Sequence, residues 1–255
     1  MNLWVPNAYL SDATLGESSL LRAPTIMSVS DVPTENLAGW YKTDELSASG
    51  GDLITSVPDS GPGGNDLQAD SGDEPEYIAS ALNGKPALYF DGFDRLYRND
   101  CFGLSGDPAL TVYVVIDVDN ITRFMGFGVP SGNGGELIDL RSDAGAEVSY
   151  RFDNGNTVYG NVDLGAWGIG CFRKGAGEAR SNHEYFQNGT AASVTGSVSG
   201  TTNISDTAYR AGDRMSAFEN PLDGHMAEWL VYTTHHDDQT RQEIETYLND
   251  KYAIF

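Results

Sequence analysis

Cysteines, basic residues and long apolar runs are all scarce in this sequence. Cys101 and Cys171 are its only cysteines, so a disulfide framework is excluded, and two free buried thiols are favoured over a single bridge. No segment approaches the roughly 18 apolar residues of a membrane-spanning helix, which argues against a membrane partner. The stretch from Met1 to Pro6 lacks a basic region followed by an apolar one. We therefore expect synthesis in a host cytoplasm without export by a signal peptide.

The shortage of basic residues gives the chain a strong negative charge. Lysine and arginine number 15 against 37 aspartates and glutamates, for a formal net charge of −22. A field of that sign repels phosphate backbones, so nucleic acid is excluded as a partner. The acids are spread along the chain, which is typical of a solvated surface, although the same acidity suits a protein that gathers divalent cations.

The residues that are abundant favour strands and turns. Thirteen tyrosines and ten phenylalanines suit strands, and thirty scattered glycines suit many turns. Residues 111–118 are nearly all apolar, as expected for a strand buried on both faces. Residues 147–152 alternate, which would turn Val148, Tyr150 and Phe152 to the core. A chain of 255 residues suits one large sandwich.

The two ends of the chain differ from this pattern. Residues 1–36 lack strand alternation, and we interpret them as an N-terminal arm that precedes a sandwich domain over 37–255. Near the other end, apolar residues recur at helical spacing down to about Lys251, with Asp237 or Asp238 as the cap. Between the ends, Asn188-Gly189 predicts a hairpin with a type I′ turn.

Four segments follow one another in the sequence: VPDSGPGGNDL at 57–67, NGKPALYFDG at 83–92, YFQNG at 185–189, and LDGHMAEWLVY followed by IETYLNDKY within 222–252. In this order they resemble the laminin-G-like branch of the concanavalin A-like lectin and glucanase superfamily. Val57 stands where the family usually has tryptophan. The resemblance covers about residues 38–255 and implies an all-β fold: a two-sheet antiparallel jelly roll with a short C-terminal helix.

Family members that begin with a short arm resemble bacteriophage tail, head-fibre and capsid-decoration proteins. The resemblance therefore implies a non-enzymatic, lectin-like protein on a virion surface that stabilises the particle, binds glycans, or does both. The arm would contact other virion proteins, and we expect a homo-oligomer. The first alternative is a bacterial carbohydrate-binding module, and a less favoured one is a polysaccharide lyase or glycoside hydrolase on the same fold.

Candidate site residues follow from these functions. Trp40, Trp167 and Trp229 carry rings that could stack on sugars, and Tyr150 and Arg151 are further candidates for carbohydrate binding. No catalytic residue is assigned, because the Glu-x-Asp-x-x-Glu spacing of laminarinase-type relatives is missing, and the acidic string at 136–143 has the wrong spacing.

Two further groups of side chains have chemistry to explain. Asp117, Asp119 and Asn120 follow a strand and offer oxygen ligands for calcium, which the family resemblance makes reasonable. Glu228 interrupts an apolar strand, so if it faces inward it needs a partner, for which Arg95, Arg210 and Arg214 are candidates.

Overall fold

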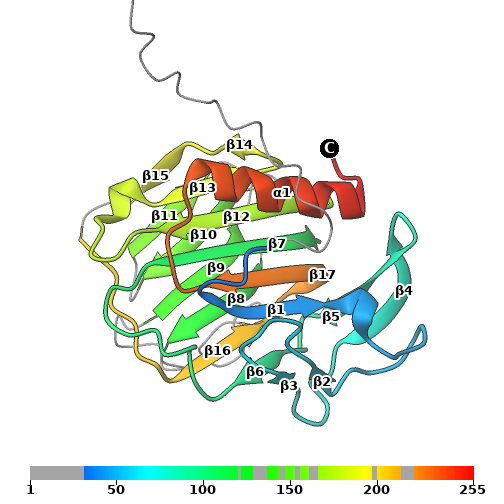
Figure 1. Ribbon diagram of the computed structural model, residues 1–255. Coiled ribbons are helices and arrows are strands. Elements are labelled where there is room, and N and C mark those ends of the chain that lie inside the picture. Colours follow the sequence, from blue (N-terminus) through cyan, green and yellow to red (C-terminus); the bar gives the residue numbers. More distant parts are fainter. Residues whose placement is uncertain are drawn as a thin grey trace, which may run out of the picture.

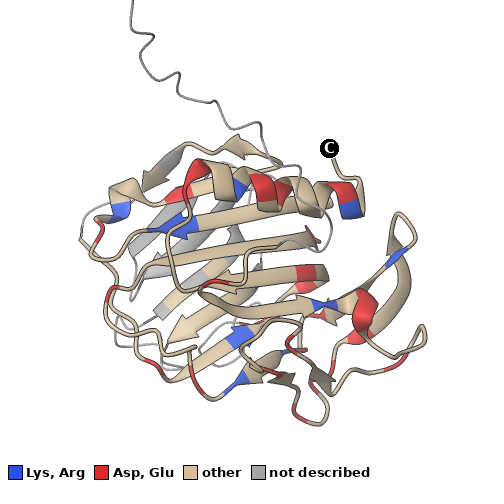
Figure 2. Ribbon diagram, viewed as in Figure 1, with Lys and Arg blue, Asp and Glu red and all other residues tan. Residues whose placement is uncertain are grey.

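The protein is a sandwich of two antiparallel sheets, with one α-helix on the outer face of one sheet (Figure 1). The computed structural model describes residues 32–119, 122–128, 137–143, 147–152, 156–160, 166–196, 200–213 and 221–255. This architecture confirms the all-β, two-sheet fold with a short C-terminal helix. Figure 2 shows acidic residues in many of the described loops, so the negative charge is distributed rather than concentrated in one block.

Sheet A carries the helix. Its strands follow one another in the order β14 (Thr190–Ala191), β13 (Glu184–Gln187), β12 (Gly168–Lys174), β7 (Leu110–Val118), β17 (Asp223–Tyr232), β5 (Lys85–Asp91) and β4 (Glu76–Leu82). One more strand, β1 (Leu37–Lys42), pairs with the second half of β17, while β5 pairs with its first half. Strand β1, near the beginning of the described chain, is therefore held by β17, near its end.

Sheet B lies opposite. Its order is β15 (Val194–Gly196), β11 (Asn156–Gly160), β10 (Glu147–Phe152), β9 (Leu137–Asp143), β8 (Thr122–Gly128), β16 (Ala208–Ala211), β6 (Leu96–Arg98), β3 (Leu67–Gln68) and β2 (Ser56–Val57). Two single-turn 3-10 helices, η1 (Thr43–Glu45) and η2 (Arg180–Asn182), lie in the connections.

Strand β7 explains why its sequence is apolar at almost every position. Val112, Val114 and Ile116 belong to the core between the sheets, whereas Tyr113 and Val115 pack in a second cluster beneath the helix α1 (Asp238–Tyr252). Successive side chains of a strand point to opposite faces, so a strand covered on both sides needs apolar residues throughout. The prediction of burial on both faces is confirmed.

A buried carboxylate joins α1 to the sheet. Glu228 is fully buried, and it accepts hydrogen bonds from Trp40 Nε1 at 2.6 Å and Tyr247 Oη at 2.9 Å. Its other oxygen accepts from Lys251 Nζ at 2.7 Å and Tyr252 Oη at 3.0 Å. The predicted need for a partner is thus met by a lysine of the helix rather than by Arg95 or Arg210, and Arg214 lies outside the described residues.

Several local predictions are confirmed. Asp237 caps α1 by accepting a hydrogen bond from the Thr240 backbone N–H at 2.8 Å. Asn188 and Gly189 have φ of 49° and 76°, as a type I′ turn requires. Cys101 and Cys171 are both buried and unbonded.

The last residues of the predicted arm, from Val32 onward, pack against the sandwich. Val32 is buried in the cluster beneath α1, and the Pro33 carbonyl accepts a hydrogen bond from Tyr232 Oη at 2.9 Å. The boundary between arm and domain at residue 36 stays a prediction, because residues 1–31 lie outside the described part. Among the helices that are described, none has the length and apolar character to cross a bilayer.

Candidate functional site

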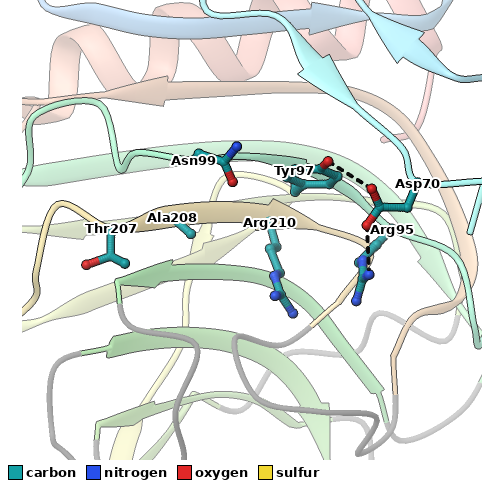
Figure 3. A pocket seen from close by; sticks show the side chains of 7 residues that line it. All are labelled: Asp70, Arg95, Tyr97, Asn99, Thr207, Ala208 and Arg210. Carbon is teal, nitrogen blue, oxygen red and sulfur yellow. Dashed lines mark hydrogen bonds and ion pairs between the residues drawn. The ribbon is translucent and has the colours of Figure 1, made fainter.

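A pocket of about 350 Å³ lies on the outer face of sheet B. Figure 3 shows it over the neighbouring strands β6 and β16, and it is lined by Asp70, Arg95, Tyr97, Asn99, Thr207, Ala208 and Arg210. The volume falls at the lower end of the range for small-molecule sites. Apart from the Tyr97 ring and Ala208, the lining offers hydroxyl, amide, carboxylate and guanidinium groups.

Strand alternation places the central side chains in this pocket. Leu96 of β6 and Tyr209 and Ala211 of β16 are fully buried in the core between the sheets. Their neighbours Tyr97 and Arg210 therefore lie on the opposite, outer face. These two residues are direct cross-strand partners, which sets their side chains beside each other.

A hydrogen-bond network fixes one wall. Asp70 accepts from Tyr97 Oη at 2.9 Å and from Arg95 Nη2 at 3.1 Å, both drawn in Figure 3. Both hydrogen bonds lower the pKa of Asp70, and the bond from Tyr97 has the larger effect. The hydrogen bond between Tyr97 and Asp70 also raises the pKa of Tyr97. Arg95 also contacts Asp73 at 2.8 Å. Contacts within the protein thus fix the position of this wall.

The two arginines do not create a positive pocket. Arg210 Nη1 lies 3.1 Å from Asp213 Oδ2, and Arg95 Nη1 lies 3.9 Å from the same oxygen. Asp213, Asp70 and Asp73 thus place three carboxylates beside the two guanidinium groups. Such paired charges still present donors and acceptors at their edges, and these can bind hydroxyl groups of a neutral ligand.

Trp40 lies elsewhere and is buried. Its exposed fraction is 8%, its indole N–H is engaged by Glu228, and its ring meets that of Tyr247 edge-on with centroids 6.1 Å apart. The Lys42 ammonium covers the ring, 3.6 Å from its centroid. The prediction that Trp40 stacks on a sugar needs correction, because α1 occupies the space that a sugar would need. The same holds for Trp229, which is fully buried in the core between the sheets.

Trp167 and Asp117 are brought together, but on sheet A. The half-buried Trp167 ring lies 5.8 Å from the His225 ring, and His225 Nδ1 lies 3.9 Å from Asp117 Oδ2. A sugar-binding candidate and a calcium candidate thus share one neighbour. Among the described residues, no group of three or more His, Cys, Asp and Glu side chains has the arrangement of a metal site. Asn120 lies outside the described residues, so the calcium set stays a prediction.

Tyr150 and Arg151 lie in β10, where the backbone is described and the side chains are not. The register pairs Arg151 with Asp139, Asp139 with Gly126, and Gly126 with Arg210. The backbone position of Arg151 therefore falls in the same cross-strand row as Arg210 of the pocket. Tyr150 pairs with Leu140, one position along.

Sequence reasoning missed the pocket itself. Its residues come from segments near positions 70, 95–99 and 207–210, which meet only because β6 pairs with β16. Arg95 and Arg210 were noted, but as partners for Glu228. The one usable signal was the alternation of Leu96-Tyr97-Arg98, which places a tyrosine on the outer face of a short strand.

Comparison with known proteins gives structural matches and no sequence matches. No family model matches the chain, and no curated protein matches it. A GH54 α-L-arabinofuranosidase soaked with a cyclic sulfate inhibitor superposes with a TM-score of 0.59 at 17% identity, over 78% of this chain and 51% of that one. The binding domain of Paraclostridial Mosquitocidal Protein 1 superposes with a TM-score of 0.57 at 8% identity, over 86% and 53%.

A third match is Trypanosoma rangeli sialidase in complex with the inhibitor DANA, with a TM-score of 0.53 at 12% identity, over 84% of this chain and 33% of that one. The chain spans between a third and about half of these structures. It shares their β-sandwich fold. At such identities the matches establish the fold, in agreement with the jelly roll that the resemblance implied, and they do not test the finer assignment to laminin-G-like phage proteins.

These matches correct one functional prediction. The chain is expected to be non-enzymatic because one catalytic motif is missing, yet the solved structures that superpose on it over part of their length include an arabinofuranosidase and a sialidase. The missing motif belongs to one class of hydrolase, and other catalytic arrangements occur on the same fold. The exclusion of enzymatic activity is therefore contradicted.

Proposed function

We propose that this chain binds carbohydrate, and that the pocket over β6 and β16 holds a neutral sugar. The observation that carries the proposal is the pocket lining, in which Tyr97, Asn99, Thr207 and two arginines offer donors and acceptors from two paired strands. Sugars present many hydroxyl groups, and binding them requires several polar groups held in fixed positions.

Charge favours a neutral sugar over an acidic one. The protein carries −22 overall, and the arginines of the pocket are paired with Asp70, Asp73 and Asp213. An incoming carboxylate or sulfate would meet these acids as well as the guanidinium groups. A hydroxyl group meets no such repulsion, since it can donate to a carboxylate and accept from an arginine.

The structural neighbours supply a first probe. An arabinofuranosidase with a TM-score of 0.59 to this chain was solved with arabinofuranosyl-α-1,2-xylobiose, at 15% identity. The alternative of a bacterial carbohydrate-binding module thus has more support than the virion-surface role. Placement on a virion, binding of other virion proteins through the arm and homo-oligomerisation stay predictions from the sequence.

The test is isothermal titration of the whole protein with arabinofuranosyl-xylobiose and a panel of neutral oligosaccharides, with sialyllactose as the acidic comparison. We expect a neutral ligand to bind, and Arg210→Ala to weaken it at least about tenfold through lost charged hydrogen bonds. Lys42→Ala is the matched control. Lys42 has 14% of its side chain exposed against 18% for Arg210, and each forms an i,i+3 ion pair.

If the folded protein binds none of the neutral sugars, or if Arg210→Ala and Lys42→Ala bind equally well, the pocket is not the site. The same samples, assayed for reducing ends, report whether bound oligosaccharide is also hydrolysed.

A further inference from the structure

Three rings form a continuous row on the outer face of sheet A, away from the pocket. The centroids of Tyr89 and His225 lie 5.0 Å apart, and those of His225 and Trp167 lie 5.8 Å apart, with both pairs tilted by 40°. All three residues are half-buried, so part of each ring meets solvent. We call these three residues the aromatic row.

The register explains the row. His225 pairs with Tyr89 on one side and with Asp117 on the other, so the three side chains share one face. On the same face of β7, Tyr113 and Val115 lie beneath α1. Asp117 comes after them on the strand and keeps 21% of its side chain exposed. The row therefore begins where the cover provided by the helix ends.

Negative charge surrounds the aromatic row. Tyr89 Oη donates to Asp223 Oδ1 at 3.3 Å, and the pKa of Tyr89 is raised by burial and then by Asp223, with Asp91 and Asp119 adding to it. Burial and Asp119 likewise raise the pKa of Asp117. In the pocket on sheet B, Arg95 offsets the effect of Asp70 on Tyr97, whereas the charged groups that shift the pKa of Tyr89 are carboxylates.

We propose that the aromatic row is a second binding site, and that its ligand is an amino-sugar chain bearing ammonium groups. Ring faces attract cations within about 6 Å and pack against the apolar faces of pyranose rings. Asp117 and Asp119 complement the ammonium charge and would accept charge-assisted hydrogen bonds from it. The site lies on the opposite sheet from the pocket, so it does not depend on the function proposed above.

The experiment compares two hexamers of equal length with the whole protein, glucosamine hexamer and N-acetylglucosamine hexamer, at about pH 6 and about 0.15 M salt. Titration calorimetry gives affinities, and tryptophan fluorescence reports contact with Trp167. We expect the glucosamine hexamer to bind at least about tenfold more tightly, because acetylation removes the charge. Asp117→Asn, which keeps the shape of the side chain, should weaken it several-fold.

Variants separate the aromatic row from general attraction to an acidic protein. Trp167→Ala should lower the affinity at least about tenfold, Trp167→Phe should retain most of it, and Arg210→Ala should leave it unchanged. Hexalysine is the control for charge alone, because it has ammonium groups but no pyranose rings, and its affinity should depend less on Trp167 than that of the glucosamine hexamer. Equal binding of the two hexamers, or a glucosamine affinity unaltered by both Trp167→Ala and Asp117→Asn, overturns the proposal.

Discussion

Lys251 Nζ lies 2.7 Å from Glu228 Oε2, and the carboxylate is completely enclosed between β1, β17 and α1. Lys251 also reaches Asp44 Oδ1 at 2.8 Å, at the margin of the same cluster. A charge removed from water needs a close partner of opposite sign and further hydrogen bonds. Glu228 has both, which explains why an acid is tolerated within an apolar strand.

Breaking this pair should be costly. Lys251→Met leaves Glu228 buried without its cation, and we expect it to lower the free energy of unfolding by about 3 kcal/mol. Glu228→Gln combined with Lys251→Met should recover part of the loss, because the uncompensated charge is gone. Urea denaturation of the two single variants and the double variant gives the coupling. Additive effects would show that the two residues act independently.

The pH dependence of stability should change at Asp94. Burial raises the pKa of this carboxyl to about 6, above its ordinary value of 3.8. The folded state then holds the proton more tightly than the unfolded state, so stability falls as pH rises from about 4 to above 6. Asp94→Asn should stabilise the protein at pH 7 by an amount on the order of 2 kcal/mol, with little difference near pH 4. Thermal melts across this range test it.

Asp70 is a control, because its contribution to stability should change with pH in the opposite direction. Its pKa is lowered by hydrogen bonds from Tyr97 and Arg95, so its contribution is present at neutral pH and disappears as pH falls. Asp70→Asn should therefore lower the melting temperature at pH 7, and the difference should shrink in acid. Parallel pH profiles for the Asp70 and Asp94 variants would contradict both assignments.

The helix cap gives a local prediction. Asp237→Ala removes the acceptor for the Thr240 N–H and should cost about 1 kcal/mol, whereas Asp237→Asn retains an acceptor and should cost much less. Equilibrium unfolding measures both. A loss as large for asparagine as for alanine would mean that charge rather than capping is responsible.

Gly224 should not tolerate a side chain. Its φ is 151°, and a Cβ there would come within 2.3 Å of the Asp117 carbonyl oxygen across the β17–β7 pair. Gly224→Ala should cost about 2 kcal/mol or more. Gly84→Ala is the control, because its φ is 78° with nothing within 4 Å of the added atom. The difference between the stability losses of the two variants gives the cost of the contact with Asp117, since both variants carry backbone strain. Equal losses in stability would show that there is no such contact.

The layered fold was predictable because it depends on local patterns. An apolar β7, the Asn188-Gly189 turn and the cap at Asp237 each act over a few residues, and neighbouring positions determine them. The order of four motif-like segments added the overall topology. None of this required knowledge of which distant side chains meet.

The candidate sites were less accessible, because they arise from pairing between distant segments. Trp40 was expected at a sugar because tryptophan suits stacking, but its environment depends on a helix some 200 positions later in the chain. Glu228 was assigned arginine partners for the same reason, whereas the residue in reach was Lys251. Tyr97 meets Arg210 through a register that no short pattern encodes.

Strand β17 has a consequence for how the molecule opens. It pairs with β7 along most of its length, with β5 at its beginning and with β1 at its end. Its backbone amides should be among the slowest to exchange with deuterated solvent, since their release requires detachment of several strands at once. Because β1 and β17 are antiparallel and Leu37 pairs with Tyr232, a force applied at the two chain ends would unzip this pair one residue at a time rather than shear it. The strand that is slowest to exchange should therefore be mechanically weak at its β1 edge.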